Sequence, residues 1–257
     1  MNIIIITCPS LALGRLSTQV AQMSPAVAAG LISELHIICM DDSEARRRVN
    51  TPYMPEKWGI DIAIGWENFM GNIIAQFQPN DASMVDHLQT LTSEACFPSR
   101  TLTSSEHSVA LRHILAIETI ARANSPCIVI EDDALVRDES LFHELLLGFR
   151  TFCKHRIFYD LTDGYIPTAK SAFKAFQIGR LRFCPRPVAA TRTLMAYAMS
   201  PYTAKILFNS LTHYSLPIDM QIQVLLSRLY LPGLFLANSP FIHGSKTNAM
   251  SSSVRQL

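Results

Sequence analysis

Hydrophobic and polar residues follow one another along this chain in blocks whose lengths predict strands and helices in turn. Four isoleucines at residues 3–6 form a short apolar run of the kind found in buried strands. A helix-like segment, 15–32, separates this run from a second apolar run at 34–40. A strand, a helix and a strand in that order predict a parallel βαβ unit.

The pattern is clearest in the middle of the chain. Apolar residues keep helical spacing after Ser104 and Ser105, either of which can cap a helix, and the strand 127–130 follows Pro126. Beyond it, the pattern predicts helices at 140–149, 201–211 and 221–229, and strands at 156–161 and 193–199. Residues 60–100 show no convincing period. The alternation predicts an α/β fold.

Composition narrows the function classes. The 257 residues suit one large domain, or one domain with a small appendage, and 49% of them are apolar. The net charge of +1 excludes a polybasic nucleic-acid binder and an acidic disordered chain, so we expect no nucleic-acid partner. The six cysteines are scattered without a C-x-x-C pair, which is typical of core residues in a reducing compartment.

The first residues lack the basic segment and long apolar stretch of a secretory signal. No window reaches the roughly 20 uninterrupted apolar residues of a membrane span. We therefore expect a cytoplasmic protein, and peripheral contact with the inner membrane stays open.

Three consecutive carboxylates, Glu131, Asp132 and Asp133, end the apolar strand 127–130. Such a row of like charges is explained if a divalent cation or a cationic ligand binds there, at the strand end where open α/β sheets bind ligands. In a strand, Glu131 and Asp133 share a face and Asp132 points the other way. The alternative is a solvated loop that caps a following helix.

Three sequence blocks resemble those of one enzyme family. They are Ser-Glu-His at 105–107 with Ala-Leu-Arg-His at 110–113, the run IVIEDDA at 128–134, and AYAMSPYTAK at 196–205 continuing to Pro-Ile-Asp at 217–219. The chain resembles glycosyltransferase family 25, the bacterial lipooligosaccharide galactosyltransferases and their collagen-modifying relatives. It departs from the family because Glu106 separates the serine from the histidine, and because the usual Asn-Leu and Gly-Cys pairs are absent.

The resemblance implies a GT-A-like (Rossmann-like) fold with a mixed sheet flanked by helices. It implies one glycosyltransferase domain over 1–257, with a nucleotide-sugar half at about 1–135 and an acceptor-side half at about 136–257. The implied reaction transfers a sugar, with inversion, to a glycan or glycolipid such as lipooligosaccharide or capsule. UDP-galactose is the first candidate among the nucleotide-sugar donors.

The resemblance implies specific roles for the acidic residues 131–133. A Mn²⁺ or Mg²⁺ ion held by carboxylates neutralises the charge that develops on a nucleoside diphosphate as it leaves. We predict Asp133 as a metal ligand, with Glu131 as a second ligand or a contact to the donor, and Asp132 as a donor contact. His243 can complete the metal site or bind the diphosphate, and Lys246 can stabilise the same charge.

The implied reaction also needs a residue that contacts the donor's phosphates and a base for the acceptor's proton. His107 is a candidate contact to the donor's phosphates, and its alternative role is to hold the start of the helix. Inverting transfer needs a carboxylate to remove the acceptor's proton, and Asp219 is the candidate base, with helix capping as its alternative. Asp163 and Asp160 are competing bases.

Two other functions fit parts of the sequence. One is a non-catalytic protein that binds glycans or partners on a diverged transferase fold, which the departures from the family allow. The other is a metal-dependent phosphohydrolase, which would need a second cluster of His and Asp that the sequence does not show.

Overall fold

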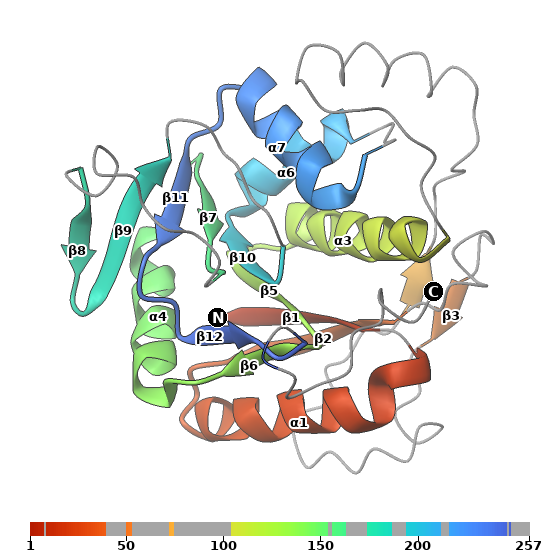
Figure 1. Cartoon of the computed structure of the whole chain (residues 1–257), viewed down its shortest axis with the longest axis horizontal. Coiled ribbons are helices and arrows are strands. Elements are labelled where there is room, and N and C mark those ends of the chain that lie inside the picture. The colour runs from red at the N-terminus through yellow and green to blue at the C-terminus, as the bar shows by residue number, and fades with distance from the viewer. Residues whose placement is uncertain are drawn as a thin grey trace.

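The computed structural model describes residues 1–7, 9–39, 50–52, 72–74, 104–153, 156–162, 174–186, 194–211, 216–245 and 247. A central sheet lies between two layers of helices, with α3, α6 and α7 on one side and α1 and α4 on the other (Figure 1). The helices are α1 (Pro9–Ala28), α3 (Ser104–Arg122), α4 (Glu139–Phe152), α6 (Pro201–Ser210) and α7 (Ile218–Arg228). The predicted α/β class is confirmed.

The sheet has eight strands in the order β2-β1-β5-β10-β7-β11-β9-β8. They are β1 (Asn2–Thr7), β2 (Glu34–Cys39), β5 (Cys127–Glu131), β7 (Phe158–Asp160), β8 (Phe176–Ile178), β9 (Leu181–Arg186), β10 (Ala196–Met199) and β11 (Gly233–Leu236). β1 pairs in parallel with β2 and β5, and β11 with β7, whereas β10 runs antiparallel to both β5 and β7. β9 pairs antiparallel with β11 and β8. The sheet is therefore mixed.

The middle strands are buried on both faces. Every residue of β1 is buried, and in β5 only Glu131 is partly exposed. Strands covered by helices on both sides read as continuous apolar runs instead of alternating ones. This is why residues 3–6 and 127–130 were recognisable as strands, and the βαβ unit formed by β1, α1 and β2 is confirmed.

Three strands of the central sheet, β8, β9 and β11, and two short ribbons were not predicted. β6 (Ala134–Val136) pairs antiparallel with β12 (Phe241–His243), and β3 (Asn50–Pro52) pairs with β4 (Asn72–Ile74). Strands of three residues leave little period to detect. Within the described part of the chain, no helix combines the length and the apolar character needed to cross a membrane.

Candidate metal centre

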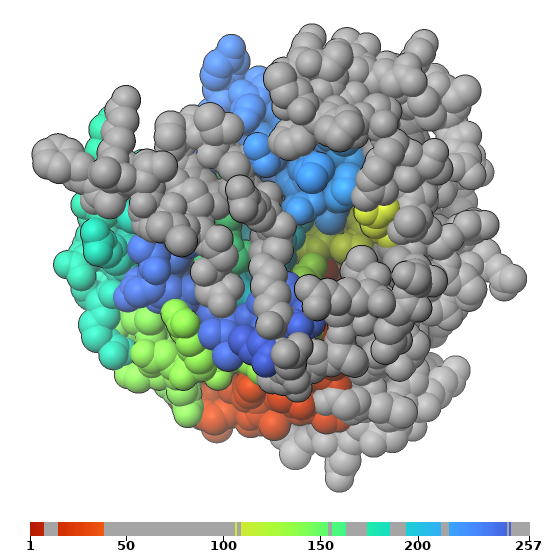
Figure 2. Space-filling model, viewed as in Figure 1, coloured from red at the N-terminus to blue at the C-terminus, as the bar shows by residue number. Residues whose placement is uncertain are grey.

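A two-residue turn connects β5 to β6 and carries the acidic block. Glu131 ends β5, Asp132 and Asp133 form the turn, and Ala134 begins β6. Because β6 pairs with β12 in the register Ala134 to His243, the late segment of the chain comes to lie against this turn. In the space-filling view the C-terminal described residues, in blue, lie above α1, in red (Figure 2).

The contact between the two segments depends on Gly244. Its backbone N–H donates a hydrogen bond to the carbonyl oxygen of Asp133 at 2.7 Å. A Cβ atom at this position would lie 2.9 Å from that same oxygen and 3.2 Å from the side chain of Leu135. Glycine is therefore the residue that lets His243 and Ser245 approach the acidic turn this closely.

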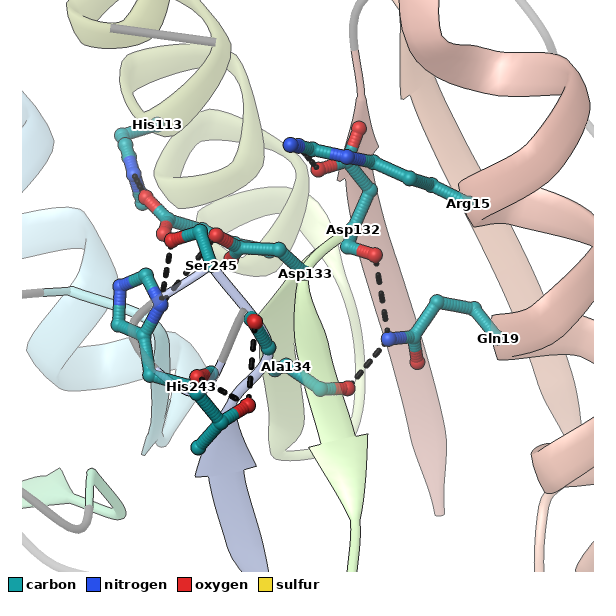
Figure 3. Close-up of polar contacts among 11 residues, drawn as sticks. Arg15, Gln19, His113, Asp132, Asp133, Ala134, His243 and Ser245 are labelled. Carbon is teal, nitrogen blue, oxygen red and sulfur yellow. Dashed lines mark hydrogen bonds and ion pairs between the residues drawn. The ribbon is translucent and has the colours of Figure 1, made fainter. Parts of the chain in front are cut away.

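Three predicted metal ligands come together here. The ligand atoms of Glu131, Asp133 and His243 all lie within 4.8 Å of one another. His243 Nδ1 lies 3.3 Å from Asp133 Oδ2 and 2.9 Å from the hydroxyl of Ser245 (Figure 3). The three residues predicted from the sequence as metal ligands, Glu131, Asp133 and His243, all belong to this cluster.

The cluster fits a small divalent cation. Ligands about 2.1 Å from an octahedral ion are about 3 Å apart when adjacent and about 4.2 Å apart when opposite. The observed separations match that scale. Asp133 is only 7% exposed, and its Oδ1 has no hydrogen-bond partner among the described residues, so this buried oxygen is available as a ligand to a cation.

The two carboxylates of the cluster titrate differently. Burial raises the pKa of Asp133, the charge of Glu131 raises it further, and His243 counteracts both. Burial also acts to raise the pKa of Glu131, but the hydrogen bond from His113 and the charges of His113, His243 and Arg112 outweigh it, so this pKa is lowered. The pKa values of the two carboxylates are therefore shifted in opposite directions, lowered for Glu131 and raised for Asp133.

Asp132 points to the opposite side, towards α1, as strand alternation predicts (Figure 3). Its Oδ2 accepts a hydrogen bond from Thr7 Oγ1 at 2.6 Å, and its Oδ1 lies 2.8 Å from Arg15 Nη1. Gln19 also donates to the carbonyl oxygens of Asp132 and Ala134. These contacts fix the turn from behind, and the predicted contact of Asp132 with the donor stays a prediction.

Asp219 lies in the first turn of α7 and is not its N-cap. Pro217 holds the cap position and makes no side-chain cap hydrogen bond, so the capping alternative for Asp219 does not hold. Asp219 Oδ1 accepts from the N–H of Met220 at 2.9 Å. Burial raises the pKa of Asp219; the Met220 bond opposes this, the charge of Glu131 adds to it, and His113 lowers it. The charges of Glu131 and His113 therefore both act on the Asp219 carboxylate.

The remaining predicted residues lie elsewhere or outside the described part. Asp160 ends β7 and is buried, with Oδ1 accepting from the N–H and hydroxyl of Thr162 at 3.0 and 2.7 Å. Asp163, Lys246 and the side chain of His107 lie outside the described residues, so their roles stay predictions.

One pair of polar residues at the site was assigned no role from sequence. His113 in α3 contacts Glu131 Oε1 through Nε2 and the Tyr197 hydroxyl through Nδ1, each at 3.2 Å. The available signal was a histidine on the apolar face of a helix, among residues such as Ala110, Ile114 and Ile117. That signal does not distinguish a core histidine from one that supports a site.

No protein-family profile matches the chain, and no curated protein sequence matches it. Among solved structures, an active-site mutant of LgtC matches all of this chain and 80% of its own, at 12% identity and a TM-score of 0.41. Apo UDP-glucose pyrophosphorylase matches 92% of this chain and 90% of its own, at 13% identity and a TM-score of 0.39.

Both TM-scores are below 0.5, and membership of glycosyltransferase family 25 stays a prediction. The chain is an α/β protein with a mixed sheet and a candidate divalent-metal centre at the carboxyl end of β5.

Proposed function

We propose that this protein is a metal-dependent glycosyltransferase that moves a sugar from a nucleotide-sugar donor to a hydroxyl of a bacterial surface glycan. The observation that carries the proposal is the grouping of Glu131, Asp133 and His243, whose ligand atoms all lie within 4.8 Å of one another. The resemblance to family 25 makes UDP-galactose the first donor to test, and lipooligosaccharide or capsule the acceptor class.

The position of the cluster in the sheet supports a nucleotide ligand. The chain leaves β1 towards β2 on one side, whereas β5 lies on the other side of β1. The parallel strands β1 and β5 therefore define a topological switch point, and open α/β sheets bind ligands outside the carboxyl ends of such strands. Thr7 and Glu131 end these two strands, directly beside the acidic turn.

The residues of the cluster suit the chemistry of glycosyl transfer. In the proposed reaction the acceptor oxygen attacks the anomeric carbon, and the bond from that carbon to the diphosphate oxygen breaks with its electron pair. Glu131, Asp133 and His243 would hold a Mn²⁺ or Mg²⁺ ion, which when bound neutralises charge on the leaving diphosphate.

Asp219 would take the proton of the attacking hydroxyl. Its raised pKa makes it a stronger base than an exposed aspartate, which suits proton abstraction in an inverting displacement. Asp163 is the competing base. His107, Asp132 and Lys246 are proposed as donor contacts, and a lipid-linked acceptor would require peripheral contact with the inner membrane.

Thermal shift against UDP-galactose, UDP-glucose, GDP-mannose and CMP-sialic acid, with and without Mn²⁺, tests the proposal. A ligand at about 100 times its Kd adds about 2.7 kcal/mol of stability. For a chain of this size that is a rise in Tm of about 5–10 °C. The proposal expects a Mn²⁺-dependent shift with one donor that Asp133→Asn abolishes.

Absence of a shift with every donor would contradict the proposal. Release of free nucleoside diphosphate from the donor that shifts the Tm separates the two main alternatives. Turnover supports an enzyme, whereas tight Mn²⁺-dependent binding without turnover in the presence of acceptor glycans would favour the non-catalytic binding protein.

A further inference from the structure

His113 lies fully buried behind the metal cluster and touches one of its members. Its side chain has 0% exposure, and its Nε2 lies 3.2 Å from Glu131 Oε1, whereas the Glu131 side chain is 25% exposed. Figure 3 shows His113 on the same side of the acidic turn as Asp133 and His243, opposite Arg15. The buried histidine therefore reaches the cluster from the interior of the protein.

His113 Nδ1 lies 3.2 Å from the hydroxyl of Tyr197, and the tautomer of His113 decides which of the two donates. Tyr197 is fully buried, and burial followed by the charge of Glu131 raises its pKa far above the ordinary value, so the hydroxyl keeps its proton. If that hydroxyl donates to His113 Nδ1, then Nε2 carries the ring's proton and donates to Glu131 Oε1. In that arrangement a hydrogen-bond donor faces an acceptor at both contacts, from Tyr197 to His113 and from His113 to Glu131.

The support behind this network is rigid. Tyr197 lies in β10, between β5 and β7, in register with Val129 and Asp160. Its ring stacks on that of Phe158, with centroids 5.5 Å apart and an interplanar angle of 20°. His113 lies at the middle of the 19-residue helix α3, and its neighbours Leu111 and Ile114 are fully buried.

We infer that His113 is a positioning residue of the metal centre: it holds Glu131 by Oε1, so that Oε2 is the oxygen presented to the cation. Groups that orient metal ligands by hydrogen bonds typically change metal affinity 10- to 100-fold when removed. The inference rests on the proposed metal site, and it adds a residue outside the ligand set whose loss should weaken cation binding.

The test is Mn²⁺ titration of the whole protein, with free Mn²⁺ followed by electron paramagnetic resonance and no nucleotide present. His113→Leu removes both hydrogen bonds and should weaken Mn²⁺ binding about 10- to 100-fold. His113→Gln keeps an amide N–H that can donate to Glu131, so it should restore most of the affinity. Tyr197→Phe keeps the ring and loses only the outer bond, so its effect should be smaller than that of His113→Leu.

A matched control is His36, which pairs with Glu34 at 3.0 Å on β2, away from the cluster. His36→Leu should leave the Mn²⁺ affinity unchanged. The Tm of each variant without metal helps to separate a positioning role of His113 from a purely structural one. If the role were purely structural, His113→Leu would lower the Tm, and His113→Gln would not restore the Mn²⁺ affinity.

The outcomes also separate this inference from the proposed function. Equal Mn²⁺ affinity in wild type, His113→Leu and His113→Gln overturns the positioning role and leaves the metal site standing. Wild-type protein that binds no Mn²⁺ overturns both. If His113→Leu fails to fold, Tyr197→Phe decides: the inference expects weaker Mn²⁺ binding than in wild type, and binding equal to that of wild type would overturn it.

Discussion

Replacement of Asp133 by asparagine should stabilise the metal-free protein while it removes the response to metal. Asp133 is buried beside Glu131, and burial and the charge of Glu131 both raise its pKa. A carboxyl whose pKa is higher in the folded than in the unfolded state makes folding less favourable as pH rises through the interval between the two values. Asparagine has no charge to ionise, so the penalty disappears.

The size of the effect follows from the spacing of the carboxylates. Their ligand atoms are at most 4.8 Å apart, and two full charges at that distance repel by about 3.5 kcal/mol at an effective dielectric constant of 20. His243, 3.3 Å from Asp133, and partial protonation relieve part of this repulsion. We expect a net gain of about 1–2 kcal/mol above neutral pH, which is a rise in Tm of about 2–8 °C.

The neighbouring residue provides the matched control. Asp132 is equally buried, but its carboxylate pairs with Arg15 at 2.8 Å and accepts from Thr7 at 2.6 Å. Asp132→Asn leaves the buried guanidinium without its anion and should cost about 3–5 kcal/mol. The same substitution at adjacent positions should thus move stability in opposite directions.

Calorimetry or fluorescence melting at pH 7.5, with chelator and then with Mn²⁺, measures both halves of the prediction. Wild type should gain stability from Mn²⁺, and Asp133→Asn should start higher in chelator and gain little. A lower Tm for Asp133→Asn in chelator would refute the claim that the charge of Asp133 destabilises the metal-free protein. A Mn²⁺ response equal to that of wild type would refute Asp133 as a metal ligand.

Three further substitutions test other parts of the structure. Gly244→Ala places a Cβ 2.9 Å from the carbonyl oxygen of Asp133, so we expect a loss of about 1–3 kcal/mol in urea denaturation and weaker Mn²⁺ binding. Unchanged values would show that the two segments do not need this close approach. Asp219→Asn should abolish transfer and, because burial raises the pKa of Asp219, should be more stable than wild type at pH 7. This difference should vanish below about pH 4, where the carboxyl is protonated in both states, and retained turnover would remove Asp219 as the base. Tyr230→Gly should raise stability by about 1 kcal/mol, because Tyr230 follows α7 with φ of 50° and is 90% exposed; a decrease would point to a packing role for the ring.

The sequence indicates the buried parts of the fold more clearly than its ribbons. The runs at 3–6 and 127–130 are apolar because helices cover both faces of β1 and β5, so their pattern is continuous and easily recognised. β6 and β12 have three residues each and pair across more than 100 positions of sequence. Neither length nor local composition signals such a contact.

At the site, too, local features can be predicted from the sequence, whereas long-range contacts cannot. Strand alternation separates Glu131 and Asp133 from Asp132, and the structure has this separation. The place of His243 depends on the pairing of β12 with β6 and on the missing side chain of Gly244, which are long-range features. The partners of Asp132 and His113 come from α1 and β10, and residue types alone do not specify such pairs.

Crystals grown with MnCl₂ and UDP, measured above the manganese absorption edge, test the central claim most directly. We predict one anomalous peak at the carboxyl end of β5, about 2.0–2.3 Å from oxygens of Glu131 and Asp133 and from a ring nitrogen of His243. The diphosphate oxygens should complete its coordination. A peak bound only by the nucleotide, or one located away from these three residues, would contradict the account.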